Sequence, residues 1–83
     1  MNFRRIIIIM ISEAQKETLI KFGLHLQALR KMKKLSLRKL ALNCNIEHSD
    51  IKRYENGQIN MTFLTIIELA KGLDVPPKDL MNF

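Results

Sequence analysis

Over most of this chain, from residue 12 to residue 81, apolar residues recur every three or four positions, the spacing of helices buried along one side. The first such stretch follows Ser12, which forms a capping-box pattern with Gln15 and so begins a helix. Thr62 is a suitable N-cap for a later helix, and Pro76–Pro77 suits the start of a short last one. The pattern predicts five helices, over about residues 13–33, 37–44, 47–56, 63–73 and 77–81.

The apolar sides of these stretches define one candidate core. Eighty-three residues are enough for a single domain with a modest core. Gly23 lies inside the first stretch, where we expect it to weaken the helix locally and take it as a candidate point of division. The positions predicted to face inward are Leu19, Phe22, Leu26, Leu29, Leu40, Cys44, Ile46, Ile51, Tyr54, Phe63, Ile66, Ile67, Ala70 and Leu73.

The first eleven residues break this pattern. Ile6–Ile11 is a continuous apolar run, mostly β-branched and too short to be a helix by itself, so we predict an extended strand. It is also far too short to cross a bilayer. We therefore divide the chain into an extended N-terminal arm, residues 1–11, and a domain, residues 12–83. One hypothesis is that the arm pairs antiparallel with the arm of a second copy. The alternatives are that it folds back on its own domain or belongs to an over-long start before Met10.

The positive charge is concentrated in one part of the chain. The formal net charge is +6, and the segment from Ala28 to Glu55 contains eight basic and three acidic residues, a local net charge of +5. A polyanion is the simplest partner for such a patch. The alternative is that charged helices only keep a small protein in solution, and charge alone does not separate the two interpretations.

Residue types that carry enzyme chemistry are sparse. Cys44 is the single cysteine, which excludes an internal disulfide and fits a reducing cytoplasm. With only His25 and His48 there is no cluster of metal ligands, and we expect no metal or cofactor. Cys44 has no apparent base partner, so we interpret it as a packing residue, and His25 as a surface residue. The sequence therefore predicts a cytoplasmic protein that is not an enzyme and does not enter a membrane.

One segment, residues 35–57, has the spacing of a helix-turn-helix. Ala41 is a small residue where the first helix packs on the second, and Asn45 tolerates the left-handed backbone of a tight turn. The segment closes on Glu-Asn-Gly at Gly57. The positions that must be apolar to fix both helices against the core are Leu40, Cys44, Ile46, Ile51 and Tyr54, and all of them are.

The helix predicted over residues 47–56 has a polar and basic outer face. In a DNA-binding helix-turn-helix, residues near the start of the second helix reach base edges in the major groove. The alternative is a solvated face on which Asp50 pairs with Arg53. The predicted base contacts are His48, Ser49, Lys52 and Arg53.

The helix predicted over residues 37–44 begins with two cations. Arg38 and Lys39 lie in its first turn, where the helix dipole favours acidic residues. A DNA phosphate at this position would make both cations favourable, because the free backbone N–H groups also attract an anion. The predicted phosphate contacts are Lys34, Ser36, Arg38, Lys39 and Asn56.

In these residues the chain resembles the lambda-repressor-like, Xre/Cro-type helix-turn-helix family. The motifs that carry the resemblance are F-G-x-x-L-x-x-L-R from Phe22, L-S-x-x-x-L-A from Leu35, I-x-x-Y-E-N-G from Ile51 and L-A-K-G-L-D-V-P-P-x-x-L from Leu69. The resemblance implies an all-α, five-helix domain that binds operator DNA as a homodimer. It also implies a structural ion pair between Arg30 and Glu55.

The combined prediction is an all-α DNA-binding domain with an N-terminal extended β arm. Its predicted function is that of a sequence-specific transcriptional regulator, a repressor, which binds double-stranded DNA at a palindromic operator as a homodimer through the helix over residues 47–56. The alternative is an antitoxin or another protein-interaction module with the same fold. Its main partner would then be a toxin or another protein, and DNA binding would be secondary or absent.

Overall fold

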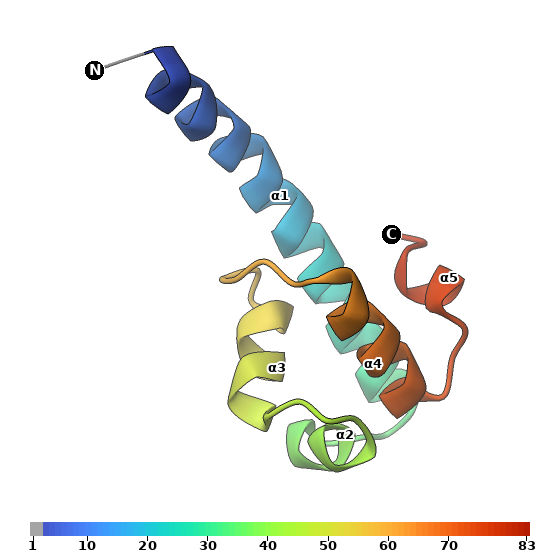
Figure 1. The fold of residues 1–83 in the computed structure, drawn as a ribbon. Helices are drawn as coiled ribbons and strands as arrows, with labels where there is room; N and C mark the ends of the chain where they lie inside the picture. The colour runs from blue at the N-terminus through green and yellow to red at the C-terminus, as the bar shows by residue number, and fades with distance from the viewer. Residues whose placement is uncertain (1–2) are drawn as a thin grey trace.

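The computed structural model describes residues 3–83, with side chains described from residue 13 onward. In this part of the chain the fold is all-α and contains no strand (Figure 1). A long first helix runs diagonally across the molecule, and four shorter helices lie beside its C-terminal half. The helices are α1 (Phe3–Met32), α2 (Leu37–Asn43), α3 (His48–Glu55), α4 (Phe63–Leu73) and α5 (Pro77–Leu80).

The N-terminal segment is helical where it is described, so the predicted extended arm is wrong for residues 3–11. These residues continue α1 without a break at Ser12, while residues 1–2 lie outside the described part. Once a helix is nucleated, each added residue gains a hydrogen bond, and the preference of isoleucine for strands is too small to stop it. Among the described residues, no helix combines the length and apolar character needed to cross a membrane.

The core lies where all five helices meet. The six largest fully buried side chains come from every helix of the fold, and partly buried residues such as Ile46 and Tyr54 pack around them. Most of the residues predicted to face inward therefore lie in the core or pack against it. The fully buried residues are Leu26, Leu40, Ile51, Leu69, Leu73 and Leu80.

Local capping explains where α2 and α4 begin. The Ser36 hydroxyl accepts a hydrogen bond from the Lys39 backbone N–H at 3.0 Å, and the Thr62 hydroxyl accepts one from the Thr65 N–H at 3.2 Å. Both residues lie immediately before the first helical position, as predicted. These side chains satisfy backbone donors that have no partner inside the helix.

The residues with a left-handed backbone differ from the prediction at the turn between α2 and α3. Asn45 is not left-handed; in the described chain, positive φ occurs at Lys34 (58°), Asp74 (57°) and Gly57 (68°). Lys34 and Asp74 end α1 and α4, where the left-handed residue allows the next N–H to reach back along the helix. At the turn between α2 and α3, Cys44 is extended instead (φ −133°), and this conformation redirects the chain.

The burial of two side chains differs from the prediction. Phe63 is 74% exposed although its spacing matched the buried side of α4. It occupies the first turn, and helical side chains lean toward the N-terminus, so its ring extends beyond the packed turns. His25 is half-buried rather than on the surface, because its Nε2 lies 2.6 Å from the Asp79 carbonyl oxygen and its ring lies beside Phe83.

Gly23 does not divide α1, and it is buried where α1 crosses the end of α3. A Cβ atom at this position would clash with the Glu55 carbonyl oxygen and lie 2.5 Å from the Tyr54 carbonyl oxygen. The missing side chain therefore allows two backbones to approach closely. This role of Gly23 was not visible in its spacing, which indicated only a weakened helix.

Candidate nucleic-acid interface

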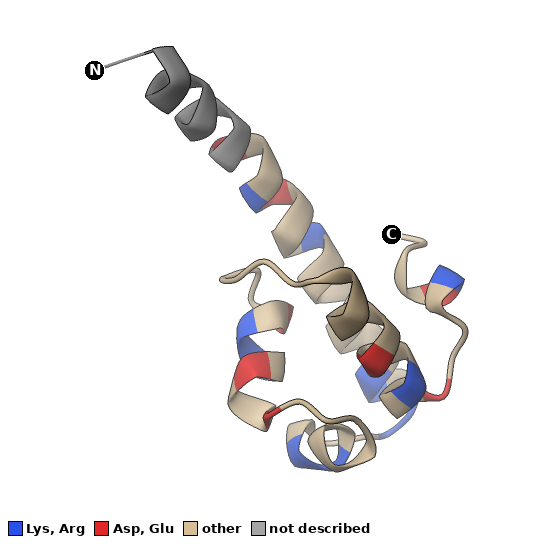
Figure 2. Ribbon diagram, in the orientation of Figure 1, with Lys and Arg blue, Asp and Glu red and all other residues tan. Residues whose placement is uncertain are grey.

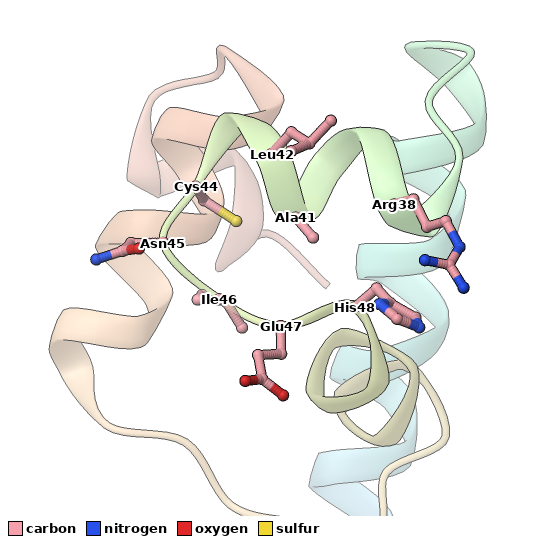
Figure 3. Close-up of a pocket in the computed structure, with 8 residues that line it drawn as sticks. All are labelled: Arg38, Ala41, Leu42, Cys44, Asn45, Ile46, Glu47 and His48. Carbon is pink, nitrogen blue, oxygen red and sulfur yellow. The ribbon is translucent and has the colours of Figure 1, made fainter.

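The turn between α2 and α3 borders a surface hollow of about 600 Å³. Figure 3 shows Arg38 and His48 on the same side of this hollow, although they belong to α2 and α3 respectively. The hollow thus brings a predicted phosphate contact next to a predicted base contact. Its lining residues are Arg38, Ala41, Leu42, Cys44, Asn45, Ile46, Glu47 and His48.

The outer face of α3 carries the other predicted base contacts. Ile51 and Glu55 are buried, so this helix has a fixed inner side, while Ser49, Lys52 and Arg53 are exposed. Figure 2 shows basic residues on α2, on α3 and at the end of α1, with acidic residues also on α3. The arrangement presents donors and a hydroxyl to a ligand outside the domain.

Arg53 also has the partner that the alternative interpretation requires. Its Nη1 lies 3.8 Å from the Asp50 Oδ1, one helical turn away, with 55% of the Arg53 side chain and 43% of the Asp50 side chain exposed. A pair this long and exposed contributes little to stability. The guanidinium can therefore leave Asp50 and donate to another acceptor at small cost.

The predicted phosphate contacts occupy three helix ends. Ser36 caps α2, with Arg38 and Lys39 exposed in the first turn of that helix. Lys34 is exposed just after the end of α1, and Asn56 is the C-cap of α3. The hollow connects Arg38 with the start of α3, whereas Asn56 lies at the opposite end of that helix.

The predicted pair between Arg30 and Glu55 is present and buried. The Arg30 Nε donates to the Glu55 Oε2 at 2.6 Å, and Nη2 donates to Oε1 at 3.0 Å, which is a bidentate geometry. The Arg30 Nη1 also donates to the Leu35 carbonyl oxygen at 2.8 Å. The hydrogen bond to Glu55 raises the pKa of Arg30 against the opposing effect of burial. This pair joins α1 to the last turn of α3 and so fixes the orientation of the outer face.

Cys44 lies under the hollow as a packing residue. It is 6% exposed, and its Sγ lies 3.1 Å from the Leu40 carbonyl oxygen. Burial raises the pKa of the Cys44 thiol, so the nucleophilic thiolate is disfavoured. Among the described residues, no three His, Cys, Asp or Glu side chains are close enough together to hold a metal ion.

Comparison with known families and structures shows which family the chain belongs to. The protein family described as "helix-turn-helix domain" matches residues 23–82, which is most of the chain. This chain belongs to the helix-turn-helix domain family. The family resemblance seen in the sequence is thereby confirmed, and the matched range contains α2, α3, α4, α5 and residues 23–32 of α1.

Two relatives cover most of this helix-turn-helix chain. The control protein C.BamHI from Bacillus amyloliquefaciens is 35% identical over 63 residues, which are 75% of this chain and 78% of that protein. The crystal structure of the restriction-modification controller protein C.AhdI from Aeromonas hydrophila has a TM-score of 0.75 and 38% identity, over 77% of this chain and 97% of that chain. The chain is therefore a helix-turn-helix transcription regulator and not an enzyme.

A third structure shares the fold. The clp gene regulator ClgR from C. glutamicum matches with a TM-score of 0.71 at 19% identity, over 76% of this chain and 82% of that chain. The helix-turn-helix arrangement is thus retained at low sequence identity.

Sequence reasoning overlooked part of the hollow. Asn45 and Glu47 both line it, yet the prediction used Asn45 only as a turn residue and gave Glu47 no role. The available signal was position: Glu47 immediately precedes His48, the first residue of α3.

Proposed function

We propose that this regulator is a cytoplasmic homodimer that places α3 of each subunit in successive major grooves of a palindromic operator, roughly 34 Å apart. The observation that carries the proposal is the hollow that joins the basic first turn of α2 to the start of α3. His48, Ser49, Lys52 and Arg53 would contact base edges, and Lys34, Ser36, Arg38, Lys39 and Asn56 would contact phosphates.

The relatives support a more specific role. C.AhdI is a restriction-modification controller protein, and 97% of the C.AhdI chain is similar to this chain. We propose that this chain likewise controls the transcription of restriction-modification genes. Occupation of an operator that overlaps a promoter would exclude RNA polymerase, so repression is the expected sign, and a promoter–reporter fusion with and without the protein measures it.

The deciding experiment is selection of binding sites from a randomised duplex library. We expect an enriched palindrome whose affinity exceeds that of scrambled DNA by roughly a thousandfold or more at moderate salt. Weak binding with a steep salt dependence and no enriched sequence would contradict the proposal. That result would favour the protein-interaction alternative, in which a toxin or another protein is the main partner.

An apolar patch on α4 supports the homodimer. Phe63 is 74% exposed and Leu64 is 71% exposed, with the half-buried Ile67 one turn later. Large apolar side chains that gather on a surface mark interaction sites. A second copy would cover both residues, and the twofold axis would pair each patch with itself.

Replacing both Phe63 and Leu64 with glutamate is expected to convert the dimer to monomer. Loss of central apolar contacts costs about 2 kcal/mol or more, which raises the dimer dissociation constant at least about 30-fold. Acidic residues in the first turn of α4 suit the helix dipole, so the fold should persist. Sedimentation velocity measures the change, with Leu24→Glu on α1 as the exposed apolar control. An unchanged dimer would place the interface elsewhere.

Removing the two cations of α2 should reduce the salt dependence of DNA binding. Each lost phosphate contact lowers the slope of log K against log salt by about 1. The proposed homodimer carries both cations in each subunit, so Arg38→Ala with Lys39→Ala should lower the slope for dimer binding by about 4. The control pair is Lys16→Ala with Lys78→Ala, which removes the same charge from exposed positions on α1 and α5. Equal slopes for wild type and the α2 variant would show that these cations do not contact phosphate.

Arg53→Ala should weaken binding to the selected operator by about 1–3 kcal/mol for each half-site and relax specificity at one base position in each half-site. The reason is that an exposed guanidinium can donate two hydrogen bonds to a guanine. Fluorescence anisotropy on single-base operator variants measures both effects. If the loss were equal on every sequence, Arg53 would be a phosphate contact instead.

A further inference from the structure

Glu47 has an unusual position for an acidic residue in a basic segment. It is the N-cap of α3, it is exposed, and its side chain makes no capping hydrogen bond. Within the described residues its carboxylate has no ion-pair partner, whereas Asp50 lies near Arg53 and Glu55 is paired with Arg30. Figure 3 shows Glu47 at the hollow beside His48.

Glu47 immediately precedes the first residue of α3 and lines the hollow with Arg38 and His48, so DNA that receives the start of α3 in its major groove would pass close to this exposed carboxylate. Phosphates repel it, and it loses hydration unless it receives a hydrogen bond. An ionised carboxylate can only accept hydrogen bonds. Its contribution therefore depends on whether the nearest base presents a donor.

The four bases differ in this respect. Cytosine presents only its N4 amino group, a donor, in the major groove, whereas guanine presents two acceptors and thymine presents an acceptor and a methyl group. Adenine presents a donor next to an acceptor, so it is a poorer partner for a carboxylate. Cytosine is thus the one base that a carboxylate favours without an adjacent repulsion.

We propose that Glu47 is a specificity-determining residue that accepts a hydrogen bond from a cytosine amino group in each operator half-site. This inference rests on the proposed function, because it requires α3 to lie in the major groove. The same carboxylate would penalise guanine and thymine at that position, so much of its effect is rejection of incorrect sites.

The test is library selection with the wild type, Glu47→Ala and Glu47→Gln. For the wild type we expect one position in each half-site where cytosine exceeds guanine and thymine by about 5-fold to 150-fold. Glu47→Ala should reduce this preference to less than about twofold and bind scrambled DNA more tightly, because a repulsive charge is lost. Glu47→Gln should shift the preferred base toward adenine, since an amide can both donate and accept.

The charge control is Glu13→Ala, which removes an exposed carboxylate from α1 and should leave the selected motif unchanged. If Glu47 acted only on the helix dipole, Glu47→Ala would lower the thermal stability of the protein without changing any base preference, and that result would contradict the inference. The inference is overturned if Glu47→Ala retains the wild-type motif, or if Glu47→Gln selects the same base as the wild type. Failure of the proposed function looks different, because the wild type would then select no motif at all.

Discussion

Replacing Glu55 with alanine is expected to lower the free energy of unfolding by about 3–5 kcal/mol, a large fraction of the stability of a domain of this size. Glu55 is 5% exposed and Arg30 is 8% exposed, so the substitution leaves a buried guanidinium without its carboxylate. Only the Leu35 carbonyl oxygen would remain as an observed partner of that guanidinium. Urea denaturation followed by circular dichroism measures the change.

Two comparisons isolate the buried pair. Asp50→Ala breaks the exposed pair with Arg53 and should cost less than about 1 kcal/mol. Arg30→Met combined with Glu55→Leu removes both charges and should recover much of the loss, because the cost arises mainly from an unpaired buried charge. If Glu55→Ala and Asp50→Ala had similar effects, the Arg30–Glu55 pair would not be a major source of stability.

Gly23→Ala is expected to destabilise the protein by about 1–3 kcal/mol, although alanine is the better helix former. The added methyl group would clash with the Glu55 carbonyl oxygen and crowd that of Tyr54, and both are backbone atoms that cannot rotate away. α1 and α3 must therefore move apart. Because Arg30 and Glu55 join the same two helices, we also expect weaker operator binding.

The control for this substitution is Ala28→Gly, at an exposed position on the same helix. It should cost up to about 1 kcal/mol, which is the intrinsic difference between the two residues. Thermal unfolding of both variants tests the sign: stabilisation by Gly23→Ala would show that the close approach of α1 and α3 is not essential.

The local structure around the candidate interface could be predicted from the sequence. Ser36 and Thr62 start their helices by local hydrogen bonds, and local bonds depend on the order of neighbouring residues. The outer face of α3 was likewise predictable, because burial of Ile51 on a regular helix determines where Lys52 and Arg53 lie. The pair between Arg30 and Glu55 was available only through the family resemblance, since spacing cannot join residues 25 positions apart.

The errors share a physical origin. Residues 3–11 have the composition of a strand but form the first turns of α1. Asn45 has the chemistry for a left-handed turn, yet an extended Cys44 makes the change of direction. Phe63 has the correct angular phase but lies in a turn that no other helix covers. In each case local preference amounts to about 1 kcal/mol or less, and the context of the fold outweighs it.

The sequence by itself determined the number of helices, most of their boundaries and the polar face of α3, because caps and periodicity act within a few residues. The tertiary structure alone decided which distant groups come together: Arg38, Glu47 and His48, which line one hollow, and the two backbones whose close approach requires Gly23. These features depend on the packing of α1, α2 and α3 against one another. Their packing is set by the whole core, and no single segment contains that information.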